Sequence, residues 1–478
     1  CPHSVLRPMI LTDGQIKAAP VTIESKDAIG FKGSKFHMGI SALDCTGCGN
    51  CVDVCPAKGK ALEMRSLSEK REIFVKIWDY VKDIDPIEIS EKQKTTVKGS
   101  QFLKPYFEYS GACAGCGETP YAKLVTQLFG DRMAIANPAG CTTVWGGSAP
   151  GIPYTTNKKG HGPAWGYSLF EDNAEYGFGM YLGSKTIRET VLKNVKLALE
   201  NGVNKELEEA MQEWLEGYKK SEGTRERADK LTNVLEKYQD MPGMKEIYDR
   251  RDYFIKQSNW IFGGDGWAYD IDFGGLDHVL AQNENINVLV FDTEVYSNTG
   301  GQSSKSTPTA AIAKFAASGK RTKKKDLGMM AMSYGYVYVA QIAMGASYKQ
   351  TLQAILEAEA YPGPSLIIAY APCINHGIKA GMGKTQEQEK RAVEAGYWAL
   401  YRYNPQLKEK GENPFILDSK DPTASYEEFL LSEVRYASLM QQYPEQAKEL
   451  FKKAEEDAKE RLESYKRLAQ QDLVLQEA

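Results

Sequence analysis

The segment Trp260-Ile-Phe-Gly-Gly-Asp-Gly266 decides the fold class of this chain. It joins a short apolar run to a glycine-rich turn with one acidic residue, which is typical of a buried strand followed by a ligand-binding loop. The apolar runs Val288–Phe291 and Ser365–Tyr370 have the same character, and helical patterns lie between the runs at Leu276–Ala281 and Gly335–Ala360. Buried strands that alternate with helices predict an α/β fold with a doubly wound parallel sheet.

Oxygen-bearing side chains follow two of these predicted strands. Asp265 lies between glycines after the first strand, and Asp292-Thr-Glu-Val-Tyr-Ser-Asn298 follows the second. Glycines let backbone N–H groups approach a phosphate, and Asp265 offers a hard oxygen ligand to magnesium. Gly-Asp-Gly followed after the next strand by an asparagine is the pattern of a thiamine diphosphate site. The alternative is a pair of ordinary turns after two strands.

The pattern departs from the usual one at a single position. Thr293 stands where the first asparagine is normally found, so a hydroxyl is expected to replace an amide oxygen as a magnesium ligand. With Asp265 and the backbone carbonyl of Val295, this hydroxyl would complete the set of magnesium ligands that the chain supplies.

Four of the nine cysteines form the run Cys45-x-x-Cys48-x-x-Cys51-x-x-x-Cys55. This is the spacing of bacterial ferredoxins, in which three thiolates hold one 4Fe-4S cluster and the fourth holds the other cluster of a pair. A structural zinc site, the alternative, usually needs two ligand pairs with a longer spacer. Cys1, which is followed by proline, resembles the end of a second run. We expect it to complete the cluster of the first three cysteines, while Cys55 serves a cluster whose other ligands lie before this chain begins.

The remaining cysteines are Cys113, Cys116, Cys141 and Cys373. Four thiols are the number that one further 4Fe-4S cluster requires, and Cys373 follows a predicted strand, where α/β folds place their sites. The alternatives are four unrelated buried thiols or a redox-active Cys-x-x-Cys pair.

Length and composition bound the remaining possibilities. The chain has 478 residues, a formal net charge of −4 and 42% hydrophobic residues, which is ordinary globular composition for about three domains. The absence of a positive field disfavours nucleic acid, and no apolar run is long enough to span a membrane. We therefore expect a cytoplasmic protein. The predicted organisation is a small iron–sulfur domain at 1–64, a connector at 65–100 and a larger domain at 101–478 with a helical insertion at about 185–258.

Taken together, these motifs resemble the pyruvate:ferredoxin oxidoreductases, within the 2-oxoacid:ferredoxin oxidoreductase family. The resemblance is carried by Tyr109–Tyr121, Gly264–Asp270 and Asp292–Gln302. It covers essentially the whole chain, as the C-terminal portion of the single-polypeptide type. The implied fold is a thiamine diphosphate-binding doubly wound sheet with helical insertions, preceded by a two-cluster ferredoxin-like α+β domain.

The resemblance also implies roles for individual residues. The quartet Cys113, Cys116, Cys141 and Cys373 would bind the cluster nearest the thiamine, so that the full enzyme holds three 4Fe-4S clusters. Asp265, Thr293 and the Val295 carbonyl would bind Mg²⁺, and Asn298 would belong to the active site. The remaining cofactor contacts would come from Glu118, Cys141, Gly264, Gly266, Trp267, Glu294, Tyr296 and Ser297.

The implied activity is the oxidative decarboxylation of pyruvate with coenzyme A to acetyl-CoA and CO₂. Electrons would pass from a thiamine adduct through the clusters to ferredoxin or flavodoxin. N-terminal domains of the same polypeptide are expected to supply the carboxylate that contacts the aminopyrimidine and the groups that bind the substrate carboxylate. The full polypeptide would form a homodimer. Two alternatives remain open, namely another 2-oxoacid as substrate and a non-catalytic iron–sulfur electron carrier.

Two further features are interpreted structurally. Lys323–Lys325 is a run of positive charge that we expect to be solvated, although contacts with coenzyme A phosphates or an acidic ferredoxin are an alternative. His376 follows Cys373 closely, and we expect it to pack behind the cluster.

Overall fold

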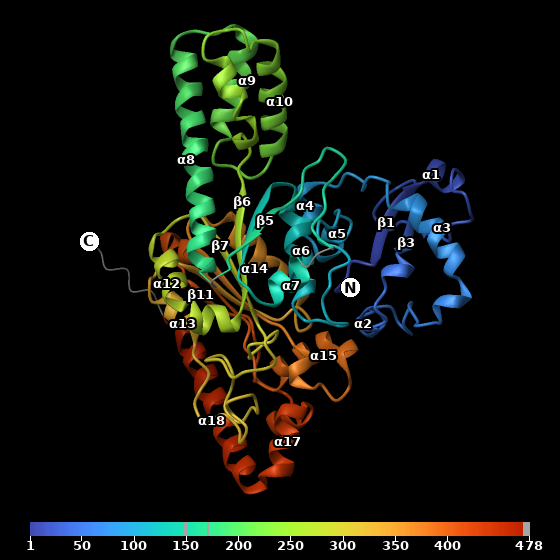
Figure 1. Ribbon diagram of the computed structural model, residues 1–478, viewed down its shortest axis with the longest axis vertical. Helices are drawn as coiled ribbons and strands as arrows, with labels where there is room; N and C mark the ends of the chain where they lie inside the picture. Colours follow the sequence, from blue (N-terminus) through green and yellow to red (C-terminus); the bar gives the residue numbers. More distant parts are fainter. Residues whose placement is uncertain (148–150, 170–171, 472–478) are drawn as a thin grey trace.

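The computed structural model describes residues 1–147, 151–169 and 172–471. A central sheet carries a column of helices at one end and a pair of helices at the other, and the N-terminal unit lies against one side (Figure 1). None of the helices in the described ranges is both long and apolar enough to cross a membrane.

The central sheet has eight strands in the order β11-β10-β8-β9-β7-β6-β4-β5. The six strands from β8 to β5 are parallel, and β10 and β11 add an antiparallel edge. This confirms the predicted α/β class with its doubly wound parallel sheet. The strands are β4 (Met133–Asn137), β5 (Ala164–Tyr167), β6 (Ser258–Gly264), β7 (Asn287–Asp292), β8 (Tyr338–Ile342), β9 (Ser365–Tyr370), β10 (Tyr401–Tyr403) and β11 (Phe415–Leu417).

Both faces of the sheet are buried, which explains why its strands read as continuous apolar runs. Successive side chains of β6 point to opposite faces, so Trp260 and Phe262 enter one core and Ile261 enters the other. The first core is covered by α6 (Thr119–Phe129), α7 (Cys141–Gly147) and α14 (Tyr348–Ala360). The second is covered by α12 (Phe273–Ala281), α13 (Leu327–Met332), α15 (Thr385–Glu394), α16 (Tyr426–Leu431), α17 (Val434–Gln442) and α18 (Pro444–Ala469), together with the start of α8.

The helical pattern predicted over Gly335–Ala360 is only partly right. Its first part is strand β8, and the helix α14 begins at Tyr348. The β-branched and aromatic residues around Val337–Val339 favour a strand, and this short run merges with the helical period that follows it.

A separate column of helices stands at one end of the sheet (Figure 1). They are α8 (Asn173–Glu200), α9 (Lys205–Glu216), α10 (Thr224–Lys237) and α11 (Met244–Tyr248). Their buried faces share an apolar core around Trp214 and Phe254. Helix α8 begins on the sheet itself, where Gly177 lies so close to Ile261 that an added Cβ would be 2.5 Å from that side chain.

The N-terminal unit contains a three-stranded antiparallel sheet in the order β1-β3-β2, formed by Leu6–Thr12, Ser34–Ile40 and Lys26–Asp27. Helix α3 (Arg71–Val81) buries Ile77, Trp78 and Val81 against this sheet. The segment predicted as a connector thus contains a helix that belongs to the N-terminal core, although the domain boundaries themselves stay a prediction. The short helices here are α1 (Asp13–Lys17), α2 (Asn50–Asp53), α4 (Glu91–Lys94) and α5 (Val97–Ser100).

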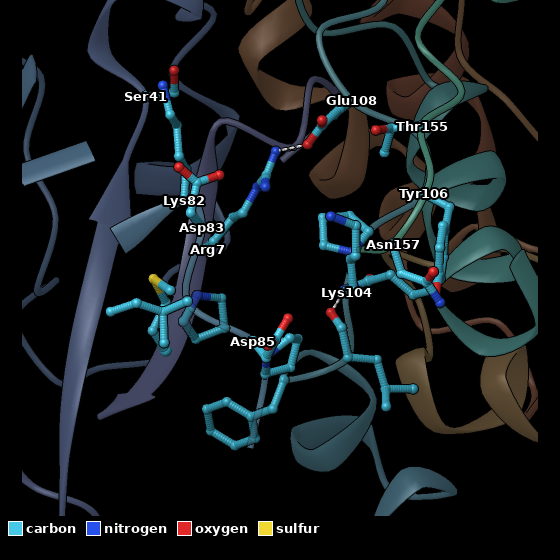
Figure 2. Close-up of a pocket in the computed structure, with 18 of the residues that line it drawn as sticks. Arg7, Ser41, Lys82, Asp83, Asp85, Lys104, Tyr106, Glu108, Thr155 and Asn157 are labelled. Carbon is cyan, nitrogen blue, oxygen red and sulfur yellow. Dashed lines mark hydrogen bonds and ion pairs between the residues drawn. The ribbon is translucent and has the colours of Figure 1, made fainter. Parts of the chain in front are cut away.

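Polar contacts hold the N-terminal unit against the larger domain. Arg7 pairs with Glu108, and the Ser4 hydroxyl donates to the Phe107 carbonyl at 2.6 Å. A cavity of about 950 Å³ lies beside the Arg7–Glu108 pair, with Tyr106 and Asn157 on the opposite wall (Figure 2). None of the described cysteines lines this cavity, so the predicted cofactor sites lie elsewhere.

Candidate functional site

The predicted site residues follow the carboxyl ends of four adjacent parallel strands. Cys141 comes after β4, Asp265 after β6, Thr293 after β7 and Cys373 after β9, and these strands are neighbours in the order β9-β7-β6-β4. Loops that leave parallel strands at their carboxyl ends lie along one edge of the sheet, where α/β folds bind ligands.

Asp265 and Thr293 join the ends of β6 and β7. The Thr293 hydroxyl donates to Asp265 Oδ1 at 2.9 Å, and the Thr293 N–H donates to the same oxygen at 3.1 Å. The Val295 carbonyl oxygen lies 3.0 Å from the Thr293 hydroxyl. The other oxygen of Asp265 accepts a bond from Ser304 at 2.6 Å, and sequence reasoning missed that serine because it lies in a long irregular loop.

The charge around Asp265 fits a cation site. Asp265 is fully buried, and burial together with the negative charge of Asp292 raises its pKa to about 8. A buried carboxylate without a nearby cation is costly, and a divalent cation beside it would remove that cost. The carboxylate, hydroxyl and carbonyl oxygens that meet here are the hard ligands that Mg²⁺ prefers.

Glu294 faces the protein core rather than the loop surface. Its carboxylate is buried and forms ion pairs with Lys324 at 2.9 Å and Arg435 at 2.8 Å. These cations hold the pKa of Glu294 at about 2 despite its burial. Lys324 also pairs with Asp292 at 2.8 Å. The expectation that Lys323–Lys325 is a solvated run is therefore wrong for Lys324, which neutralises two buried carboxylates.

The other predicted contacts with the thiamine cofactor surround the Gly-Asp-Gly turn. Gly266 begins a π-helical turn, η5 (Gly266–Ile271), and packs against Tyr296 so closely that an added Cβ would lie 2.5 Å from the ring. The Trp267 indole is buried and donates to Asp272 at 2.6 Å. Gly264 is the last residue of β6, and Asn298 is exposed in the loop after β7. The assignment of these residues to the cofactor stays a prediction.

The four cysteines of the predicted quartet lie close enough to interact. Burial raises the pKa of Cys141, and the charges of Glu118, Cys373, Cys116 and Cys113 add to this effect. Burial also raises the pKa of Cys116, with further contributions from Glu118 and Cys373. Glu118 is itself buried and accepts a hydrogen bond from the Trp145 indole, and its pKa is raised by burial to about 7. The fold thus brings the quartet and Glu118 to one place.

Asn375 links the quartet to the loop after β7. Its amide donates to the Ser297 carbonyl at 3.2 Å and lies 3.5 Å from the Cys373 sulfur. The Ser297 hydroxyl in turn lies 2.5 Å from that of Thr293. His376 is buried behind this loop, with Nε2 at 2.7 Å from the Thr293 carbonyl oxygen. Sequence analysis did not single out Asn375, although its position two residues after Cys373 is a signal that could have found it.

The cysteines of the N-terminal unit form two groups. Cys51 interacts electrostatically with Cys48 and Cys45. Cys55 stands apart, and its thiol accepts a hydrogen bond from the Ala61 N–H at 3.3 Å. Backbone N–H groups, with that of Ala61 contributing most, lower the pKa of Cys55. This grouping is compatible with the prediction that Cys55 serves a different cluster.

Comparison with protein families identifies two domains in the chain. Residues 254–369 match the C-terminal TPP-binding domain of thiamine pyrophosphate enzymes. Residues 37–101 match the 4Fe-4S dicluster domain. These matches confirm the thiamine diphosphate and iron–sulfur cofactors and the fold that was predicted for each part.

The chain is also similar to long enzymes over almost its whole length. It is 61% identical to the pyruvate-flavodoxin oxidoreductase of Klebsiella pneumoniae and 57% identical to the pyruvate:ferredoxin oxidoreductase of Moorella thermoacetica, over 98% of the chain in both cases. It is 45% identical to a mitochondrial pyruvate dehydrogenase [NADP(+)] of Euglena gracilis, again over 98% of the chain and over 26% of that protein. The chain spans 40% of the Klebsiella protein and 41% of the Moorella protein. Over the stretch that it shares with them, the chain is similar to the pyruvate:ferredoxin and pyruvate-flavodoxin oxidoreductases.

Proposed function

We propose that this chain supplies one half of an active site for the oxidative decarboxylation of pyruvate with coenzyme A. It would also bind the iron–sulfur clusters that accept the electrons released by this reaction. The observation that carries this proposal is the Asn375 amide, which contacts both the Ser297 carbonyl and the Cys373 sulfur. This contact joins the loop after β7 to Cys373, which supports a transfer of electrons from a thiamine site to the quartet. When bound, thiamine diphosphate supplies an electron sink for decarboxylation, and iron–sulfur clusters accept single electrons at low potential.

The chain's own residues would hold the cofactor at its diphosphate end. Asp265, the Thr293 hydroxyl and the Val295 carbonyl would bind Mg²⁺, which would fix the diphosphate against the ends of β6 and β7. Ser304 would orient the second oxygen of Asp265 by its 2.6 Å hydrogen bond. Because Asp265 and Thr293 are buried, the site would exclude water around the metal.

The cysteines would form a relay for electrons. The quartet of Cys113, Cys116, Cys141 and Cys373 would hold the cluster nearest the thiamine. Cys1, Cys45, Cys48 and Cys51 would hold a second cluster, and Cys55 would contribute to a third, which makes three clusters in the full enzyme.

The names of the relatives guide the choice of the electron acceptor. Relatives are named for flavodoxin, for ferredoxin and for NADP(+), so the acceptor differs among them, and we propose ferredoxin or flavodoxin for this chain. We further propose a cytoplasmic homodimer in which N-terminal domains of the same polypeptide complete the active site.

The test is a comparison of substrates. The full polypeptide, purified anaerobically, should reduce flavodoxin or ferredoxin with pyruvate and coenzyme A, and much more slowly with 2-oxoglutarate or 2-oxobutyrate. Faster reduction with another 2-oxoacid would identify that acid, rather than pyruvate, as the substrate. Failure with all three acids, while dithionite still reduces the clusters, would favour a non-catalytic electron carrier.

A further inference from the structure

One short segment of the larger domain lies between two of the predicted cluster loops. The helical turn η7 (Met382–Lys384) precedes α15 and contacts the loop of Cys113–Cys116 on one side. On its other side it contacts the start of α2, next to Cys48.

The contact with the quartet loop is made backbone to backbone. Gly115 lies between Cys113 and Cys116, is buried and has a φ of +78°, a conformation that favours glycine. A Cβ atom at Gly115 would lie only 2.3 Å from the carbonyl oxygen of Met382. The glycine therefore allows the cluster loop to touch the main chain of η7.

The contact with the N-terminal unit has the same form. A Cβ atom at Gly383 would lie 2.3 Å from the carbonyl oxygen of Cys48. Two side-chain contacts hold this approach in place, because the buried Asn50 amide donates to the Thr385 hydroxyl at 2.9 Å and Lys384 forms an ion pair with Asp53. Two consecutive residues of η7, Met382 and Gly383, thus touch the two cysteine loops.

We propose that the main chain of Met382–Gly383 bridges the quartet cluster and the cluster of Cys45, Cys48 and Cys51, and that electrons cross between the two domains here. One electron leaves the reduced quartet cluster, which is oxidised, and reduces the second cluster, with no bond made and no proton moved. Electron transfer weakens steeply with distance, so Gly115 and Gly383 act as positioning residues that keep the gap short. This inference rests on the proposed function, since the electrons come from the thiamine site.

The test is Gly383→Ala in the full, cluster-loaded polypeptide, with Gly183→Ala as the control. Gly183 lies in α8 with no atom within 4 Å of an added Cβ, so the control makes the same change without a clash. Iron content and reduction by dithionite should match the parent protein. The proteins are then mixed with pyruvate and coenzyme A and frozen rapidly for EPR. At times when the parent protein and the Gly183→Ala control show the signals of both reduced clusters, Gly383→Ala should show only the signal of the quartet cluster.

A second readout needs no substrate. In the dithionite-reduced protein, the magnetic interaction between the quartet cluster and the second cluster should be weaker in Gly383→Ala than in the control. Unchanged interaction and unchanged transfer in an iron-replete Gly383→Ala protein would overturn the bridge. If Gly383→Ala loses iron, Thr385→Val takes its place, because this change removes only the hydrogen bond with Asn50. A magnetic interaction and an electron transfer that both match the parent protein in Thr385→Val would likewise overturn the proposed bridge. A parent protein that pyruvate does not reduce at all would refute the proposed function, whereas the dithionite measurement would still decide the bridge.

Discussion

The hydroxyl of Thr293 donates a hydrogen bond to Asp265 Oδ1 at 2.9 Å and so ties together the ends of two neighbouring parallel strands. Both residues are buried, and the Val295 carbonyl lies at 3.0 Å from the same hydroxyl. Three oxygen ligands from two separate loops therefore already lie together. This arrangement supports the proposal that magnesium and the diphosphate end of thiamine bind at this edge of the sheet.

Replacement of Asp265 by alanine should abolish the binding of thiamine diphosphate while leaving all the clusters in place. The variant loses the charged oxygen ligand, and none of the predicted cluster ligands contacts Asp265. Bound thiamine and iron can be measured on the same purified sample. Asp277→Ala, on the exposed side of α12, is the matched control and should keep both. Full thiamine stoichiometry in Asp265→Ala would contradict the assignment of the magnesium ligand.

Replacement of Cys373 by serine should remove one cluster, about four iron atoms per chain, and abolish turnover. The clusters of the N-terminal unit should survive, since the cysteines that interact with Cys373 are Cys141 and Cys116 of the quartet. Iron analysis and the EPR spectrum of the reduced protein separate the two outcomes. An unchanged iron content would mean that the quartet has been assigned wrongly.

Replacement of Lys324 by methionine should lower the free energy of unfolding by about 3–5 kcal/mol, because Asp292 and Glu294 would be left as buried charges with less compensation. Lys323→Met is the matched control. Lys323 is exposed and pairs with Asp457 and Glu460 at the surface, so its loss should cost no more than about 1 kcal/mol. Chemical denaturation of the two variants measures the difference. Equal midpoints would show that the buried ion pairs do not stabilise the fold.

Glu389 should make the fold less stable as pH rises. Its burial raises the pKa from 4.5 to about 8, although hydrogen bonds from Gly345 N–H and Tyr121 partly oppose this. Between these two pH values the folded chain keeps a proton that the unfolded chain has lost, so stability falls as pH rises from about 4.5 to about 8.

Glu389→Gln removes this titration and should flatten that part of the pH profile. The neighbouring Gln386 amide, whose oxygen has no hydrogen-bond partner among the described residues, can rotate to accept from the new amide group. Apparent unfolding temperatures at pH 6 and pH 8.5 provide the measurement. The difference between the two should shrink in the variant, and an unchanged difference would mean that Glu389 is already ionised in the folded protein.

The sequence was informative for the two strands that carry the predicted magnesium ligands, although it assigned strand β8 to a helix. The runs around Trp260–Gly266 and Val288–Phe291 became neighbouring strands, and the rule on carboxyl ends of parallel strands brought Asp265 and Thr293 together. What the sequence could not supply depends on contacts between distant segments. Asn375 matters only because its loop meets that of Ser297.

Contacts between distant segments also explain why the sequence did not predict the burial of Lys324 or the contact of Gly383 with Cys48. Lys324 lies in a stretch of three lysines that looks solvated, and only the packing of Glu294 and Asp292 around it makes it a core residue. The contact of Gly383 with Cys48 crosses between two domains, so no local pattern near either residue predicts it.

The central claim is that the thiamine site and the quartet cluster act as one unit, and a single-turnover measurement tests it most directly. The full polypeptide, loaded with thiamine diphosphate and kept anaerobic, is mixed with pyruvate and coenzyme A, and the visible absorption of the clusters is followed in time. We predict that pyruvate bleaches the cluster absorption of the parent protein but not that of Asp265→Ala. Dithionite should bleach the cluster absorption of both proteins. Absorption that only dithionite changes, in the parent protein as in the variant, would contradict the claim.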